Sequence, residues 1–143
     1  MKWTNGMIKQ IAMQQSALDA NCSVKDFICG KNMVIISKEN ELARKYLKLP
    51  HVCNLISYGD NIVATISEKY RDIVEQYINK YPVEHCFETP NMHVLNDAFQ
   101  GLGFRVCFMA EYFLGVDNGG TVTKAALFDQ NGREIASTSQ STP

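Results

Sequence analysis

The chain has 143 residues, 45% of them hydrophobic and 20% charged, and its 14 basic and 15 acidic side chains leave a formal net charge of −1. This length suits one ordinary domain, or one domain with a short attachment, and is sufficient for a hydrophobic core. The balanced charge argues against a generic nucleic-acid or membrane-surface binder, which carries a basic excess, and the ordinary apolar content argues against disorder.

The N-terminal segment carries too many polar residues for a secretory signal, and no apolar run approaches the roughly 20 residues of a membrane span. Five cysteines at irregular spacing are typical of reduced thiols and not of a secreted disulfide framework. We therefore expect a cytoplasmic protein with neither a membrane nor a nucleic acid as its partner.

The first predicted elements are a helix, a short capped turn and a strand. Capping chemistry at Thr4-Asn5, followed by apolar residues at helical spacing, predicts a helix over 6–20. Ser23 is a favourable cap for one short turn of helix that ends at Phe27. The compact run at 33–37, rich in β-branched residues, predicts a buried strand.

A short helix and a hairpin are predicted next. Residues 41–47 favour a short helix that Pro50 prevents from continuing. Two apolar strands, 53–58 and 62–66, flank the turn residues Gly59-Asp60-Asn61 and predict a β-hairpin.

Two further helices and a long extended segment follow the hairpin. The helix over 67–81 is predicted to start at a serine cap and to bury one apolar face. Thr89-Pro90 marks the start of a helix that runs to about residue 100, where two glycines end it. Residues 104–116, rich in aromatic and β-branched side chains, form the longest predicted extended segment.

The composition changes from Gly115 onward. Asn118-Gly119-Gly120 and Gln130-Asn131-Gly132 are turn signals that separate strands, of which the last two span 122–128 and 133–137, before a Ser/Thr-rich tail. The pattern predicts an antiparallel three-stranded meander. The predicted fold class is therefore α/β (α+β), with a mixed N-terminal segment followed by this meander.

The meander contains the most informative motif of the chain. An apolar strand brings Asp117 to the mouth of a glycine turn, and a carboxylate suits the hydrated Mg²⁺ that accompanies nucleotide phosphates. Backbone N–H groups exposed by glycines, hydroxyls and an ammonium group follow it, and all of these suit a phosphate. The candidate phosphate-binding residues are Gly119, Gly120, Thr121, Thr123 and Lys124.

With its flanking residues, this motif resembles the N-terminal start of FGGY-type carbohydrate kinases, which belong to the superfamily of sugar kinases, actin and heat-shock ATPases. The resemblance covers about 112–143 and implies a sheet of the actin-like sugar-kinase type, with ATP and Mg²⁺ as cofactors. It implies that Asp117 lies near the Mg²⁺, that residues 119–121 face the phosphates, and that Lys124 lies on the second strand. Gly120 stands where many members carry threonine, which removes one hydroxyl.

In that family the second phosphate loop, the adenosine-binding segment and the aspartate general base lie far downstream, and this chain stops at Pro143. Phosphoryl transfer depends on positioning and charge neutralisation in a closed cleft. We therefore expect an incomplete carbohydrate kinase-like protein that is inactive alone, has no catalytic residue of its own, and takes a nucleotide and a sugar only when missing segments complete it.

The first part of the chain carries a different resemblance. Met1-Lys-Trp-Thr-Asn and the stretches 47–61, 82–91 and 105–114 are similar to the N-terminal region of GNAT-family N-acyltransferases, which implies acetyl-CoA as an alternative cofactor. The family's pyrophosphate loop is not found, because Gln100-Gly-Leu-Gly-Phe lacks its spacing. We expect no acetyl transfer by this chain alone.

The two resemblances meet inside a strand pattern near 112–114, with no spacer rich in Pro, Ser or Gly between them. This arrangement suggests a fusion of two gene fragments or a truncated product, with a partial GNAT-like domain over 1–112 and the start of a kinase-like domain over 113–143. The remaining alternative is a non-catalytic interaction module, which could self-associate through its strand edges.

Histidines and cysteines are the residue types of a zinc site or of a Cys–His nucleophile. Their spacing fits no closed zinc site, and a nucleophile requires an orienting group and an oxyanion hole that the sequence does not reveal. Ordinary buried cysteines and surface histidines are the expectation. The residues concerned are His51, Cys53, His85, Cys86 and His93.

Overall fold

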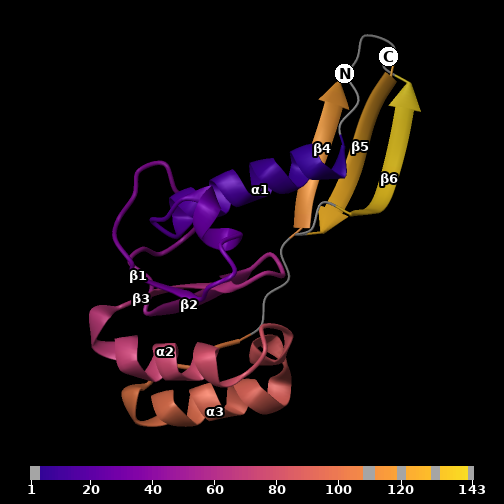
Figure 1. Cartoon of the computed structure of the whole chain (residues 1–143). Coiled ribbons are helices and arrows are strands. Elements are labelled where there is room, and N and C mark those ends of the chain that lie inside the picture. Colours follow the sequence, from indigo (N-terminus) through magenta and orange to yellow (C-terminus); the bar gives the residue numbers. More distant parts are fainter. Residues whose placement is uncertain (1–3, 108–111, 119–121, 130–132, 142–143) are drawn as a thin grey trace. The chain divides into compact units, whose positions relative to one another are not determined.

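The computed structural model describes residues 4–107, 112–118, 122–129 and 133–141. The fold is α+β and contains two three-stranded sheets (Figure 1). The chain divides into two compact units, Gln14–Phe108 and Met1–Met13 with Met109–Pro143, and each unit contains one sheet. No helix in the described part of the chain has the length and apolar character needed to cross a membrane.

The first helix and the capped turn confirm their predictions. Helix α1 spans Asn5–Asp19, and the Thr4 hydroxyl accepts a hydrogen bond from the backbone N–H of Met7 at 3.2 Å. A 3-10 helix, Val24–Phe27, follows, and the Ser23 hydroxyl accepts from the N–H of Lys25 at 3.1 Å. The Asp26 carboxylate accepts in return from the N–H of Ser23 at 2.8 Å, which completes a capping box.

The sheet of the unit Gln14–Phe108 contains β1 (Met33–Ile36), β2 (Cys53–Ser57) and β3 (Ile62–Ile66) in the order β1-β3-β2. Strand β3 runs parallel to β1 and antiparallel to β2, so the predicted hairpin is confirmed. Every residue of β3 is buried, whereas β1 and β2 are half-buried because they lie at the edges of this sheet.

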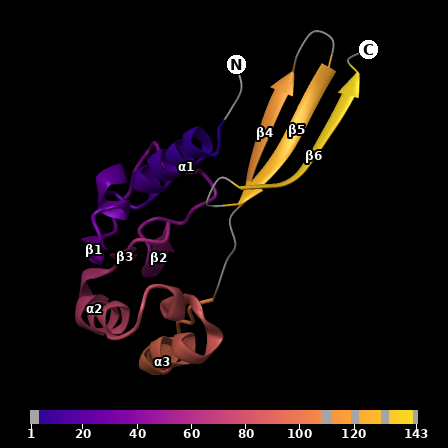
Figure 2. The same ribbon diagram turned by 45° about the vertical axis from the view of Figure 1, so that its right-hand side comes forward.

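Both faces of this sheet are covered. On one face, alternate residues of β3 pack with helices α2 (Arg71–Lys80) and α3 (Thr89–Phe99) to form the main hydrophobic core. On the other face, the Thr65 hydroxyl donates to the carbonyl oxygen of Ala20, just beyond α1, at 3.3 Å. Figure 2 shows the strands β1–β3 between the end of α1 and the pair α2 and α3.

The two later helices lie where they were predicted, with different starts. A 3-10 helix, Glu68–Tyr70, precedes α2, and the Ser67 side chain makes no capping hydrogen bond. Helix α3 has Pro90 in its first turn, as predicted, but Thr89 lies within the helix and Glu88 precedes it. The chain leaves α3 through a further 3-10 turn that ends at Gly103, whose φ of 74° lies in the left-handed region that glycine favours.

The helix predicted over 41–47 is wrong, because these residues form successive turns. A segment this short is a marginal helix by itself. Its backbone is also bonded elsewhere, since the N–H of Arg44 donates to the Asp19 carboxylate at 2.9 Å and the N–H of Leu42 donates to the Asn40 side chain at 3.0 Å.

The continuous extended segment predicted over 104–116 is also wrong, since residues 104–107 lie outside any strand and β4 begins at Tyr112. The Asn96 side chain from α3 replaces a strand partner at Val106. It accepts from the N–H of Val106 at 2.7 Å and donates to the carbonyl oxygen of the same residue at 3.1 Å.

The second sheet confirms the antiparallel meander. Its strands are β4 (Tyr112–Asn118), β5 (Val122–Asp129) and β6 (Glu134–Ser141), in the order β4-β5-β6. Strand β6 continues through most of the expected Ser/Thr tail, and the register shift between Leu127 and Phe128 marks an irregularity in its pairing with β5. All eight residues of β6 are exposed. The residues at the centres of both predicted turns lie outside the described residues.

Candidate phosphate-binding hairpin

The register of β4 and β5 pairs the two charged positions of the motif. Asp117 on β4 lies directly opposite Lys124 on β5, and the next pair toward the connection is Asn118 with Thr123. Directly opposite positions in an antiparallel pair share one face of the sheet, whereas successive pairs alternate between faces. The carboxylate-bearing and ammonium-bearing positions therefore belong to one face of the hairpin, and Thr123 belongs to the other face.

The remaining candidates lie in the connection between these strands. Gly119, Gly120 and Thr121 fall outside the described residues. Lys124, whose side chain is exposed, also pairs along the backbone with Ser139 of β6. Strand β5 thus places this lysine in the middle of the sheet, one pair away from the end of the β4–β5 ladder.

This arrangement has two chemical capacities. A carboxylate and an ammonium group on opposite residues of one face can form a cross-strand ion pair, which contributes roughly 0.2–1 kcal/mol. The same two groups can instead bind different parts of a magnesium nucleotide. The carboxylate oxygens suit hydrated Mg²⁺, and the lysine is a point charge suited to phosphate. The second capacity requires donors from the connection between the strands.

A metal site built from histidine, cysteine and carboxylate side chains is not found among the residues that the structure describes. His85 is exposed and lies 4.0 Å from Glu88, measured from Nε2 to Oε1, whereas the adjacent Cys86 is buried. These two neighbours agree with the expected surface histidine and buried cysteine, whereas His51, whose Nε2 is buried, departs from that expectation.

All five cysteines are free, and two of them, Cys53 and Cys86, are unsuited to nucleophilic chemistry in their folded surroundings. Burial raises the pKa of Cys53 to about 12 and, together with the nearby Glu84, raises the pKa of Cys86 to about 11. Since the thiolate is the reactive form, these two thiols remain protonated and inert near neutral pH.

A buried polar cluster at the end of α1 was not anticipated from the sequence. Asp19 is only 1% exposed, and its carboxylate forms an ion pair with the Arg44 guanidinium and accepts from the Gln15 amide at 3.1 Å. The buried Nε2 of His51 has no hydrogen-bond partner among the described residues, and burial lowers the pKa of this imidazole although the Asp19 charge opposes the shift. The cluster fixes the long connection between β1 and β2 to α1.

Comparison of the chain with protein-family models, with curated proteins and with solved structures finds no match.

Proposed function

We propose that the β4–β5 hairpin is the phosphate-binding element of a carbohydrate kinase-like protein. It binds the phosphates of a magnesium nucleotide such as ATP, as the resemblance to FGGY-type kinases implies, within a sheet of the actin-like type. Asp117 orients the hydrated Mg²⁺, and Lys124 together with the donors of residues 119–123 neutralises phosphate charge.

The observation that carries this proposal is the register, which pairs Asp117 with Lys124 one step from the strand ends that Gly119, Gly120 and Thr121 join. A single hairpin leaves most of a nucleotide in solvent, so its affinity is limited. We expect a dissociation constant in the millimolar range, equivalent to a binding free energy of about −4 kcal/mol.

The test is a titration of magnesium ADP with the chain, followed by the phosphorus-31 resonances of the nucleotide. Asp117→Asn should abolish the Mg²⁺-dependent binding of the nucleotide, and Lys124→Gln should weaken binding of the nucleotide about tenfold. Asp72→Asn and Lys80→Gln, which change the same two residue types on α2, serve as controls and should leave the titration unchanged. If Asp117→Asn and Lys124→Gln both bound the nucleotide as strongly as the original chain, the assignment would be refuted.

A further inference from the structure

The longest connection within the unit Gln14–Phe108 joins β1 to β2, and we call residues 37–52 the β1–β2 loop. The structure describes all of these residues, and none of them belongs to a helix or strand. Connections of about this length without regular structure are uncommon in compact domains and usually have a function of their own. The role of this loop is independent of the proposed phosphate-binding hairpin.

The β1–β2 loop is held in one conformation by the end of α1. The Asn40 amide donates to the carbonyl oxygen of Leu18 at 2.7 Å, and the N–H of Lys38 donates to the side chain of Asn21 at 2.8 Å. The backbone N–H of Arg44 donates a hydrogen bond to the buried Asp19 carboxylate, and the Arg44 guanidinium forms an ion pair with it. A loop fixed in this way loses little conformational entropy when it binds a partner.

This fixed loop exposes the two least covered large hydrophobic side chains among the described residues. Leu42 is 70% exposed and Tyr46 is 67% exposed. The Arg44 guanidinium lies over the Tyr46 ring, 5.4 Å from its centre. One exposed apolar side chain needs no explanation. This loop carries two such side chains, and its tyrosine and the arginine stacked on it belong to the residue types that anchor protein–protein interfaces.

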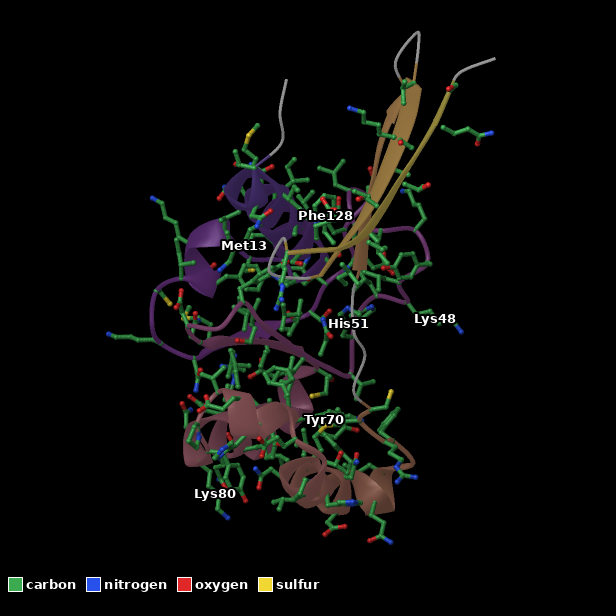
Figure 3. The ribbon with its side chains drawn as sticks, turned by 90° about the vertical axis from the view of Figure 1, so that its right-hand side faces the viewer. Met13, Lys48, His51, Tyr70, Lys80 and Phe128 are labelled. Carbon is green, nitrogen blue, oxygen red and sulfur yellow. The ribbon has the colours of Figure 1, made fainter. Side chains whose placement is uncertain are left out.

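The charge beside these side chains indicates the chemistry of a partner. Lys45 and Lys48 lie close to Tyr46 in the chain and are both exposed, and Figure 3 shows Lys48 directed away from the ribbon. Residues 43–52 contain no acidic side chain, whereas the exposed Glu39 and Glu41 precede Leu42. The loop has four cations, Lys38, Arg44, Lys45 and Lys48, but Arg44 is paired with Asp19 and two glutamates lie on the same loop. The remaining positive excess is smaller than that of segments that bind anionic membranes or nucleic acids. An acidic polypeptide fits this surface better than either alternative.

We propose that the β1–β2 loop docks an acidic polypeptide segment that carries an aromatic or aliphatic anchor residue. The anchor covers Leu42 and Tyr46, and carboxylates beside it meet Lys45 and Lys48. The surface is small, so the interaction is weak and transient, as is usual for small interfaces.

The experiment selects peptides from a random library displayed on phage against the intact chain and then measures the affinity of the enriched peptides by fluorescence anisotropy. The enriched peptides should combine acidic residues with an aromatic or aliphatic residue. Leu42→Ser combined with Tyr46→Ser should weaken their binding about tenfold or more, and Lys45→Gln combined with Lys48→Gln should weaken it several-fold and reduce its dependence on salt.

Ile28→Ser is the matched control, because Ile28 is an exposed hydrophobic residue of the same unit at 52%. It should leave peptide affinity unchanged, and circular dichroism of every variant should show the same secondary structure. The proposal is overturned if no peptide is enriched, if the enriched peptides lack acidic residues, or if the Leu42/Tyr46 variant binds them as tightly as the original chain. Binding of phosphatidylserine vesicles or of RNA through Lys45 and Lys48, without peptide enrichment, would overturn it in favour of those partners.

Discussion

The two sheets of this protein are built in contrasting ways. In the unit Gln14–Phe108, the central strand β3 is buried along its whole length, with helices on one face and the end of α1 on the other. In the C-terminal sheet, the edge strand β6 is exposed along its whole length and is composed mostly of polar residues. Stability therefore depends on side-chain packing in the first sheet, whereas backbone pairing has the larger share in the second.

The contrast extends to function. The first unit uses its buried polar groups to hold the β1–β2 loop, and its exposed hydrophobic residues on that loop suit a macromolecular partner. The second sheet pairs a carboxylate position with an ammonium position on one face, which suits a small anionic ligand and a metal ion. The predictions below test this division, beginning with the largest expected effect.

Phe99→Ala should cause the largest loss of stability. Phe99 is fully buried and packs edge-to-face on Tyr70 at 5.4 Å between ring centres. Removing a buried phenylalanine side chain costs about 3–5 kcal/mol. Ile135→Ala in β6, where the side chain is 50% exposed, should cost about 1 kcal/mol or less. Urea unfolding of both variants provides the measurement, and equal losses would contradict the contrast between the sheets.

Arg44→Met should destabilise the first unit by about 3 kcal/mol, because it leaves the carboxylate of Asp19 buried without its cationic partner. The double variant Asp19→Leu/Arg44→Met removes both charges and should recover much of this loss. Urea midpoints of the single and double variants measure the coupling between the two residues. If Arg44→Met had no effect, the ion pair would not be what holds the β1–β2 loop to α1.

His51 should make the stability of the first unit dependent on pH. Burial lowers the pKa of this imidazole below 6.5 in the folded chain, so the folded state binds fewer protons than the unfolded state. The contribution of His51 to stability is therefore present above the unfolded pKa and is lost as the pH falls through the folded pKa.

The measurement compares urea midpoints of the original chain and His51→Gln at about pH 7.5 and about pH 5. His51→Gln should show a smaller decrease in midpoint on acidification. His93→Gln, at an exposed histidine, is the control and should decrease as the original chain does. An unchanged decrease in His51→Gln would show that another group causes it.

Acetyl-CoA should not bind measurably to the first unit. The glycine-containing stretch after Gln100 follows helix α3, whereas a pyrophosphate-binding loop precedes the start of a helix, where N–H groups point at the anion. Calorimetric titration provides the measurement. A micromolar dissociation constant, equivalent to about −8 kcal/mol, would instead favour the acyltransferase alternative.

Asp117→Asn should have the smallest effect on stability. Without a bound metal ion, the main stabilising interaction open to this aspartate is an ion pair with the residue opposite it on β5. Such a cross-strand pair contributes roughly 0.2–1 kcal/mol to the free energy of unfolding. The urea midpoint of this variant in the absence of nucleotide should therefore lie close to that of the original chain. A loss as large as that of Phe99→Ala would make this carboxylate a structural residue and would remove the main residue of the proposed site.

Local signals in the sequence were sufficient for most elements of the fold. Turn residues between apolar runs identified the β2–β3 hairpin and the strands of the meander, and Pro90 located the first turn of α3. These features depend on residues that are close together in the chain. The same is true of the proposed hairpin, whose paired positions are separated only by a short connection.

The errors arose from contacts between distant residues. The turns at 41–47 depend on Asp19, and the irregular stretch at 104–107 depends on Asn96, neither of which the local pattern reveals. One feature of the sequence does indicate such a distant contact. A carboxylate at the C-terminal end of a helix interacts unfavourably with the helix dipole and therefore requires a specific partner. Asp19 occupies such a position at the end of α1.

The most direct test of the central claim is an amide spectrum of the nitrogen-15-labelled chain recorded during titration with magnesium ADP. The account predicts that the resonances of residues 117–124 shift progressively, that those of β1–β3 and α2 do not, and that the shifts require Mg²⁺ and disappear in Asp117→Asn. Shifts confined to the unit Gln14–Phe108, or shifts at the β4–β5 hairpin that persist unchanged in Asp117→Asn, would contradict it.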